Sequence, residues 1–222
     1  MSQELWSAVD GYINGKLLTP DATLDAALAD SAAAGLPQIA VAPNQGKLLH
    51  LLARIAGARS ILEIGTLGGY STIWLARALP AGGRLVTLEY DPKRAAVAQA
   101  NIARAGVADR VEVRVGAALE TLPVLAAEAR PPFDLVFVDA DKPSIPEYFT
   151  WALRLTRPGS VIVFDNTVRD GALADPATTD ANVIGVRRLH DMLSAEPRVS
   201  ATTLQTVGSK GYDGLTIGLV VG

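Results

Sequence analysis

The expected fold follows from one stretch of the sequence, Ile61-Leu62-Glu63-Ile64-Gly65-Thr66-Leu67-Gly68-Gly69-Tyr70-Ser71. Its first residues form a short, mostly apolar run that predicts a buried strand, and its glycines predict a tight turn. The amphipathic segment Ser71–Leu79 then predicts a helix. A strand, a glycine turn and a helix in this order are typical of sheets in which ligands bind beyond the carboxyl ends of the strands. A tight turn that holds no ligand is the alternative for this motif by itself.

The same alternation continues along the chain after this stretch. The expected strands are Ile61–Ile64, Arg84–Leu88, Val111–Val115, Phe133–Val138 and Val161–Phe164. The further expected helices are Pro92–Ala105, Ala117–Ala127, Pro146–Leu155 and Val183–Ser194. Strands that are apolar almost throughout and are separated by helices indicate a parallel sheet with helices on both faces.

The two ends of the chain depart from this alternation. The segment before Gly57 predicts three helices, which are Gln3–Asn14, Thr23–Ala34 and Gln45–Ile55. Asn44 is the expected N-cap of the third helix, because its side chain can accept a hydrogen bond from a free backbone N–H. At the other end, Ala201–Thr206 and Leu215–Val220 predict two strands. The gap between these strands is too short for a helical crossover, so they should pair antiparallel, and Tyr212-Asp213-Gly214 is interpreted as turn sequence.

Composition restricts the kind of protein and the kind of metal site. A length of 222 residues suits one domain, and a net charge of −3 argues against sequence-independent nucleic-acid binding. The chain has no cysteine and only two histidines, His50 and His190, so any metal should be held by oxygen ligands, which favours Mg²⁺, Mn²⁺ or Ca²⁺. The N-terminus lacks a signal-peptide pattern and no stretch is long and apolar enough to span a membrane, so we expect a cytoplasmic protein.

The acidic residues around the glycine turn indicate the class of cofactor. The glycine spacing differs from the G-x-G-x-x-G pattern of dinucleotide sites, and Glu63 in front of the turn would repel phosphates but suit a cationic group. Glu89 ends the next expected strand and can accept hydrogen bonds from the two hydroxyls of a ribose. A nucleoside without phosphate that carries a positively charged amino acid fits both features. S-adenosylmethionine is such a molecule, and NAD is the less suitable alternative.

Two neighbouring strand ends carry acidic residues that suit a cation. One expected strand ends in Asp139-Ala140-Asp141-Lys142, and the next ends in Asp165-Asn166. If these strands are adjacent, two carboxylates and an amide oxygen converge as hard ligands and leave open positions that a vicinal diol on an aromatic ring can fill. Lys142 beside such a cation is a candidate general base for the acceptor hydroxyl. A solvated capping turn is the alternative, and it would have to occur at both strand ends.

With these motifs the sequence resembles the cation-dependent class I O-methyltransferases, the family of catechol and caffeoyl-CoA O-methyltransferases. The resemblance runs from about Val41 to the C-terminus and rests on Glu63–Ser71, Asp139–Lys142 and Asp165-Asn166-Thr167. It implies a Rossmann-like, mostly parallel seven-stranded sheet with a C-terminal antiparallel hairpin and extra N-terminal helices. It further implies S-adenosylmethionine as methyl donor, a divalent cation, a small aromatic acceptor and a homodimer.

The resemblance also assigns roles to individual residues. Asp139, Asp165 and Asn166 would be the metal ligands and Lys142 the catalytic base. The cofactor contacts would be Val41, Glu63, Gly65, Thr66, Ser71, Glu89, Ala118, Asp139 and Asp141. Residues 1–57 would cover the acceptor site, and residues 58–222 would form the cofactor- and metal-binding core. The sequence departs from many relatives after Thr167, where Val168-Arg169-Asp170-Gly171 replaces a segment with a tryptophan that helps form the acceptor pocket.

The expected function is the transfer of a methyl group to one hydroxyl of a metal-chelated vicinal diol on a catechol, hydroxycinnamoyl or flavonoid-type molecule. Two alternatives stay open on the sequence. One is methylation of hydroxyuridine in transfer RNA, which needs a basic rim beside the pocket and is disfavoured by the acidic composition. The other is a catalytically silent, cofactor-binding dimeric scaffold, which would predict loss of the base or of the metal ligands.

Overall fold

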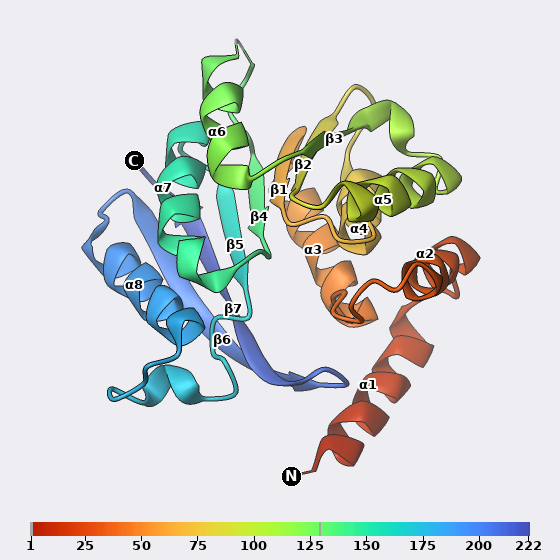
Figure 1. Ribbon diagram of the computed structural model, residues 1–222, viewed down its shortest axis with the longest axis horizontal. Coiled ribbons are helices and arrows are strands. Elements are labelled where there is room, and N and C mark those ends of the chain that lie inside the picture. Colours follow the sequence, from red (N-terminus) through yellow and green to blue (C-terminus); the bar gives the residue numbers. More distant parts are fainter. Residues whose placement is uncertain (1, 129) are drawn as a thin grey trace.

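A seven-stranded sheet forms the centre of the computed structural model, which describes residues 2–128 and 130–222 (Figure 1). The strands lie in the order β3-β2-β1-β4-β5-β7-β6. Their bounds are β1 Ser60–Ile64, β2 Arg84–Glu89, β3 Val111–Val115, β4 Leu135–Val138, β5 Val161–Asp165, β6 Val199–Gly208 and β7 Gly211–Val220. All neighbouring pairs are parallel except β5 with β7 and β6 with β7, which are antiparallel. This topology confirms the expected α/β fold with a C-terminal antiparallel hairpin.

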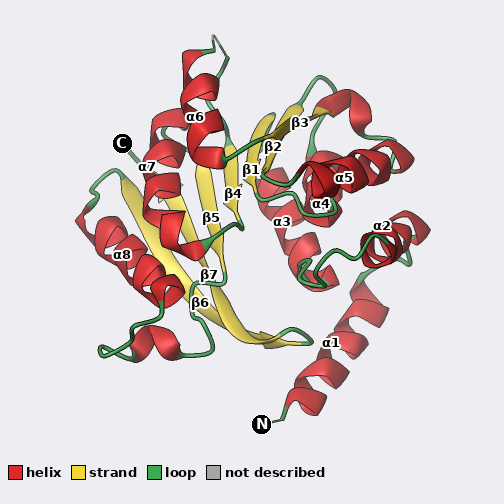
Figure 2. Ribbon diagram, in the orientation of Figure 1, coloured by secondary structure: helices red, strands yellow, loops and turns green. Residues whose placement is uncertain are grey.

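Helices cover both faces of the sheet, as Figure 2 shows. The α-helices are α1 Gln3–Leu17, α2 Ala22–Ala33, α3 Pro43–Ile55, α4 Tyr70–Ala78, α5 Pro92–Arg104, α6 Ala118–Ala127, α7 Ile145–Leu155 and α8 Ala181–Ala195. Short 3-10 helices are η1 Ala108–Arg110, η2 Lys142–Ser144 and η3 Ala172–Ala174. None of the helices in the described part of the chain is long and apolar enough to cross a membrane.

The core has two apolar layers because the central strands are buried on both faces. In β1, Ile61 packs with side chains of α3, α4 and α5, whereas Leu62 and Ile64 pack with side chains of α6, α7 and α8. All three side chains are fully buried. Successive side chains of a strand point to opposite faces, so a strand covered on both sides must be apolar on both sides. This burial explains why the central strands were recognisable as continuous apolar runs.

The C-terminal hairpin is longer than the sequence predicts. β6 and β7 each span 10 residues, and Gly208 pairs with Gly211, so the expected gap Val207–Gly214 is mostly strand. The physical reason is that β6 lies at the edge of the sheet and most of its side chains are exposed. An exposed edge strand does not need an apolar run, and its pairing is therefore invisible to an argument from hydrophobic pattern.

The prediction that Asn44 caps the third helix is wrong. Helix α3 begins at Pro43 with Ala42 as the N-cap residue, so Asn44 lies inside the first turn. Pro43 suits the first helical position because that position needs no backbone N–H donor. The Asn44 side chain instead donates from Nδ2 to Oδ1 of Asp10 on α1, at 2.9 Å. It thereby links two of the N-terminal helices.

The same Asp10 side chain ties the N-terminus to the tip of the hairpin. Its Oδ2 accepts the backbone N–H of Ser209 at 2.7 Å, and Gln3 donates from Nε2 to the carbonyl of Gly208 at 2.9 Å. In Figure 1 the red helix α1 accordingly lies beside the blue tip of β6 and β7. The first helix and the tip of the C-terminal hairpin therefore meet at one corner of the molecule.

Candidate active site

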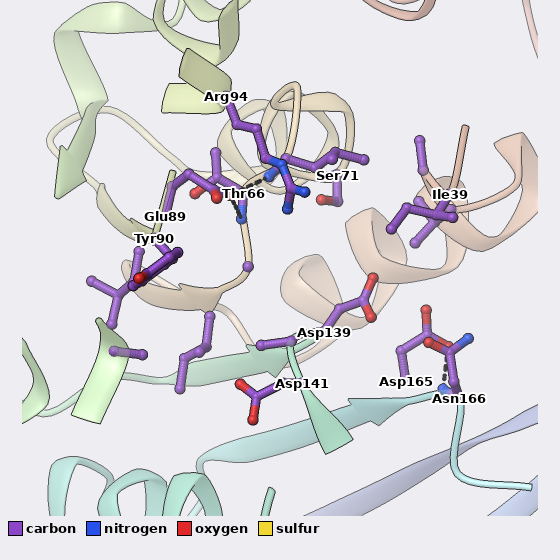
Figure 3. A pocket seen from close by; sticks show the side chains of 18 of the residues that line it. Ile39, Thr66, Ser71, Glu89, Tyr90, Arg94, Asp139, Asp141, Asp165 and Asn166 are labelled. Carbon is purple, nitrogen blue, oxygen red and sulfur yellow. Dashed lines mark hydrogen bonds between the residues drawn. The ribbon is translucent and has the colours of Figure 1, made fainter. Parts of the chain in front are cut away.

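A cavity of about 950 Å³ lies at the carboxyl edge of the parallel strands. It is lined by residues that follow β1, β2, β4 and β5, and by the segment between α2 and α3. The sequence-predicted site residues among them are Val41, Gly65, Thr66, Ser71, Glu89, Ala118, Asp139, Asp141, Lys142, Asp165 and Asn166. Figure 3 shows several of these side chains around the cavity. Of the predicted residues, only Glu63 lies outside its lining.

The sheet topology explains why these residues meet. The strand order reverses at β1, which pairs with β2 on one side and with β4 on the other, and such a reversal opens a crevice at the carboxyl edge. β4 and β5 are parallel neighbours with Val138 opposite Phe164, so Asp139, directly after β4, and Asp165, the last residue of β5, lie at the same level. The structure thus confirms that the two acidic strand ends are adjacent.

Gly65 allows the glycine turn to approach the acidic corner. Its φ is 102°, a left-handed conformation that favours glycine. A Cβ atom at this position would overlap the backbone carbonyl of Asp139. Any side chain here would therefore push the end of β1 away from the end of β4.

Glu63 lies beneath the glycine turn and is fully buried. Its carboxyl group accepts hydrogen bonds from the hydroxyls of Ser71 (2.6 Å), Thr72 and Thr87 (2.7 Å). Burial raises the pKa of Glu63 to about 7, although the three hydroxyl donors favour the charged form. In this structure Glu63 fixes the start of α4, which carries Ser71, against β2.

Glu89 at the end of β2 holds the other side of the glycine turn. Its Oε2 accepts the backbone N–H groups of Thr66 (3.3 Å) and Leu67 (2.8 Å), and its Oε1 accepts that of Asp91 (3.0 Å). The carboxylate still lines the cavity and has lone pairs left for a ligand. Glu89 is therefore fixed in position before any ribose binds.

The carboxylates of Asp139 and Asp165 lie close together at the ends of β4 and β5, as Figure 3 shows. Burial, reinforced by the negative charge of Asp139, raises the pKa of Asp165 to about 7. The described residues contain no group of three or more His, Cys, Asp and Glu side chains that would hold a metal. A cation here would consequently depend on the amide oxygen of Asn166 as its third protein ligand, and a cation would relieve the repulsion between the two carboxylates.

Lys142 adjoins this pair and is only 6% exposed. Its Nζ lies 3.2 Å from Oδ1 of Asp139. The 3-10 helix η2 that carries Lys142 packs under helix α8, where Gly185 gives the necessary space. A Cβ atom at Gly185 would overlap the carbonyl oxygen of Lys142. The position of Lys142 therefore depends on a glycine 43 residues further along the chain (185 − 142).

Asp141 points away from Asp139 and Asp165 in Figure 3. Its Oδ1 accepts the hydroxyl of Tyr148, and its Oδ2 accepts the backbone N–H of Ser144 at 3.3 Å. Burial and the charge of Asp141 together raise the pKa of Tyr148 above its ordinary value. The three acidic residues at this edge thus serve two different parts of the cavity.

The loop after Asn166 is held in an unusual conformation by Asp213. Asn166, Arg169 and Asp170 have φ values of 52°, 56° and 54°, in the left-handed region that residues with side chains rarely adopt. Oδ1 of Asp213 accepts the backbone N–H groups of Val168, Arg169 and Gly214, each at 2.9 Å. The interpretation of Tyr212-Asp213-Gly214 as turn sequence is therefore wrong, because Asp213 lies within β7 and clamps this loop.

Several other residues line the cavity but were not predicted to do so. They are Gln38, Ile39, Gln45, Tyr90, Arg94, Tyr148, Asn182 and Lys210. Arg169 also lines the cavity, and it lies in the loop that the resemblance placed at the acceptor pocket. Tyr90 could have been predicted from the sequence, because it is an aromatic residue directly after Glu89 at a strand end. In the structure its side chain is 78% exposed. Lys210 at the hairpin tip donates from Nζ to the carbonyl of Gln38 at 3.0 Å. Its position depends on the hairpin length that the sequence did not reveal.

Comparison with known proteins identifies relatives of this chain. The sequence pattern of the O-methyltransferase family matches residues 21–219. The chain is 54% identical to catechol O-methyltransferase of Niastella koreensis over 220 residues, which cover 99% of this chain and 100% of the relative. Its fold is similar to that of the O-methyltransferase from Bacillus cereus in complex with SAH, with a TM-score of 0.98, 56% identity and coverage of 99% and 100%.

A second solved structure is equally similar. The O-methyltransferase TomG from Streptomyces achromogenes, which is involved in tomaymycin synthesis and was crystallised with SAM, has a TM-score of 0.97 and 56% identity. The alignment covers 100% of both chains. These findings confirm the resemblance drawn from Glu63–Ser71, Asp139–Lys142 and Asp165–Thr167: this chain belongs to the O-methyltransferase family.

Proposed function

We propose that this protein transfers the methyl group of S-adenosylmethionine to one hydroxyl of a catechol-type acceptor, with a divalent cation held by Asp139, Asp165 and Asn166. One observation carries the proposal. The buried carboxylate of Asp165, the half-buried carboxylate of Asp139 on the adjacent strand end, and Lys142 share a single cavity with the glycine turn and Glu89. The Niastella koreensis relative, named catechol O-methyltransferase, supports this class of acceptor.

The cofactor half of the cavity suits an adenosyl group joined to a cationic amino acid. Glu89, held by three backbone N–H groups, would accept the ribose hydroxyls. Gly65, Thr66 and Ser71 would surround the amino-acid part, and Ala118 and Asp141 would adjoin the adenine. S-adenosylmethionine supplies a methyl group on a positively charged sulfur when it is bound. The Bacillus cereus and TomG structures, described with SAH and SAM, support this assignment.

The metal half of the cavity suits Mg²⁺, with Mn²⁺ and Ca²⁺ as alternatives. Three oxygen ligands from the protein leave positions for the two hydroxyls of a vicinal diol. A bound cation supplies positive charge that favours the deprotonated acceptor hydroxyl. Asp139 and Asp165 would hold that cation, and their closeness is then a benefit rather than a cost.

Lys142 is the proposed general base. Its Nζ lies beside Asp139, so a hydroxyl oriented at the acidic corner would be within reach of it. Lys142 would accept the hydroxyl proton while the oxygen forms a bond to the methyl carbon and the bond from that carbon to sulfur breaks. The protein contributes mainly by fixing donor and acceptor in line, because methyl transfer needs little other chemistry.

The N-terminal part of the chain would form one wall of the acceptor side. The segment from Gln38 to Val41 and Gln45 lines the cavity, whereas no residue of α1 does so. Helix α1 affects the cavity only indirectly, because Asp10 makes hydrogen bonds to Asn44 and to the hairpin tip. We therefore assign acceptor coverage to the segment between α2 and α3.

The deciding experiment follows methyl transfer from labelled S-adenosylmethionine to catechol and to resorcinol, with Mg²⁺ and with excess EDTA. We expect product only from catechol, whose hydroxyls are adjacent, and only with the metal. Asp165→Ala should abolish turnover, whereas Asp175→Ala, which removes a carboxylate from an exposed turn outside the cavity lining, should not. Equal turnover in excess EDTA would overturn the metal-dependent mechanism.

A further inference from the structure

Arg169 lies in the wall of the cavity with its hydrogen-bonding capacity unused. Its Nε is buried, and no acceptor among the described residues lies within hydrogen-bond distance of it. Its Nη1 is 3.9 Å from Oδ2 of Asp213, which is too far for a hydrogen bond. A partly buried guanidinium without acceptors is costly, so this group is suited to an acceptor that a ligand brings.

Each acidic group near Arg169 uses one carboxylate oxygen on other donors, and among the described residues Oδ2 of Asp213 makes only the long ion-pair contact of 3.9 Å with Arg169. Oδ1 of Asp213 accepts three backbone N–H groups and thereby holds the loop. Asp180, whose charge also reaches Arg169, accepts the N–H groups of Asn182 at the start of α8. Neither residue supplies the planar pair of oxygens that a guanidinium binds best.

The placement of Arg169 is built rather than incidental. Arg169 and Asp170 both have positive φ values, and such strain persists only where surrounding structure enforces it. Asp213 supplies that enforcement through the N–H of Arg169 itself. Arg169 follows Asn166 by three residues, a span of at most about 10 Å. Its guanidinium is thus within reach of a substituent on a ring held at the acidic corner.

A second cation lines the same cavity. Lys210 at the tip of the hairpin lines the cavity and uses one of its three N–H donors on the carbonyl of Gln38. The lining thus carries the carboxylates of Asp139 and Asp165 at the strand ends, and the cations Arg169 on the loop after β5 and Lys210 on the hairpin. A molecule that fits both parts has oxygen donors for a cation at one end and a negative charge at the other.

We infer that Arg169 selects acceptors whose aromatic ring carries a carboxylate in addition to the two adjacent hydroxyls. The inference rests on the proposed function, because the proposed metal corner fixes the hydroxyl end of the acceptor. A carboxylate is planar and matches the fork of the guanidinium with two parallel hydrogen bonds. Arg169 is in this sense a specificity-determining residue and takes no part in the transfer of the methyl group.

The test compares acids with their uncharged amides. We would measure kcat/KM with Mg²⁺ for 3,4-dihydroxybenzoate and 3,4-dihydroxybenzamide, and for 3,4-dihydroxycinnamate and its amide, which place the carboxylate at two distances from the ring. For at least one pair we expect the wild-type protein to favour the acid by about 10- to 100-fold, as charge-assisted hydrogen bonds predict. Arg169→Met should lower kcat/KM for the acid far more than for the amide, so that the ratio of the two falls to about one.

Two further variants and a binding measurement complete the test. Arg188→Met removes the same charge from an exposed position of α8 outside the cavity lining and should keep the preference for the acid. Calorimetric binding of SAH shows that Arg169→Met is folded. Arg169→Lys keeps the positive charge but not the planar guanidinium, so its preference for the acid should lie between those of the wild-type protein and Arg169→Met. The inference is overturned if the wild-type protein uses acids and amides equally, or if the preference survives in Arg169→Met. Failure to methylate any of the four compounds would instead count against the proposed function.

Discussion

Glu63 is buried beneath the glycine turn, and its carboxyl group receives three hydroxyl hydrogen bonds. The sequence drew attention to it as an acidic residue before a glycine turn, and suggested direct contact with a cationic cofactor. Its position is as expected, but its partners, Ser71, Thr72 and Thr87, come from α4 and β2. Those partners are brought together only by packing of the helix on the sheet, which local sequence does not encode.

The raised pKa of Glu63 predicts a pH-dependent stability. The pKa is 4.5 in the unfolded chain and about 7 in the folded protein, so folding binds a proton between these values. The contribution of Glu63 to stability is therefore most favourable below pH 4.5 and becomes less favourable as the pH rises to 7. The change amounts to about 3 kcal/mol, since one pKa unit corresponds to about 1.4 kcal/mol.

Glu63→Gln tests this prediction by urea unfolding between pH 4.5 and 8. The variant has no titrating group at this position, so its free energy of unfolding relative to wild type should rise by about 3 kcal/mol across the range. Taking the difference between the two proteins cancels the titration of other groups. The amide that this substitution introduces accepts fewer hydroxyl hydrogen bonds than the carboxylate, and this loss lowers the free energy of unfolding by the same amount at every pH. A difference that does not vary with pH would contradict the prediction.

Among the strands, the sequence predicted the buried ones closely and the exposed edge strand only in part. The central strands are apolar on both faces and were found within two residues of their observed ends. The edge strand β6 was found only in part, because its side chains are exposed and its length is set by pairing with β7. The role of Asp213 was missed because its hydrogen-bond partners lie 44 and 45 residues earlier in the chain.

The contact of α8 with η2 predicts the effect of a small substitution. In Gly185→Ala the new Cβ meets the carbonyl of Lys142, so the helix or η2 must move, at a cost of about 1–3 kcal/mol. We expect a fall in kcat with little change in SAH binding, because Lys142 moves and the glycine turn does not. Gly15→Ala in α1 is the control, since the described residues leave open space around it, and it should stabilise the protein by about 0.5–1 kcal/mol. Equal kcat values for the two variants would refute the packing argument.

The loop clamp predicts a local effect at a second element. Asp213→Ala leaves the N–H groups of Val168, Arg169 and Gly214 without their shared acceptor, at a cost of about 2 kcal/mol. Hydrogen exchange at these three amides should accelerate, and KM for the acceptor should rise while SAH binding is retained. Asp175→Ala removes a carboxylate that accepts one N–H in an exposed turn, and should change neither quantity. Unchanged exchange at Val168 and Arg169 in Asp213→Ala would show that the loop does not need the clamp.

At the scale of the whole molecule, the exposed side of α1 predicts how the protein associates. Leu5, Val9 and Tyr12 follow the i, i+4, i+7 spacing of one helix face, and Tyr12 is 70% exposed. We expect a homodimer that covers this face, with a mass by light scattering near twice 23.2 kDa. Val9→Glu combined with Tyr12→Glu should give monomers, whereas Val124→Glu on exposed α6 should not. A monomeric wild-type protein, or a dimer that survives the double substitution, would exclude this interface.

The order of the strands was predictable only in part. The expected convergence of Asp139 and Asp165 assumed that their strands are adjacent, and the sheet has this arrangement. The insertion of β7 between β5 and β6 did not follow from any pattern, because strand order depends on long-range pairing. The residues predicted to contact the cofactor, Glu63 excepted, therefore line one cavity, whereas the hairpin residue Lys210 lines it without having been predicted.

The hydrogen bond from Ser209 to Asp10 spans 199 residues, and this distance affects the order in which the parts of the enzyme fold and unfold. The glycine turn and both acidic strand ends lie within residues 60–166, so their part of the cavity depends on contacts formed within that span. The corner with Lys210 needs the last hairpin of the chain to close onto its first helix, and loops of such length are slow to close. We expect this corner to be the last to assemble on the ribosome and the first to open on heating. A warmed or newly made molecule would then hold its methyl donor before it can choose what to methylate.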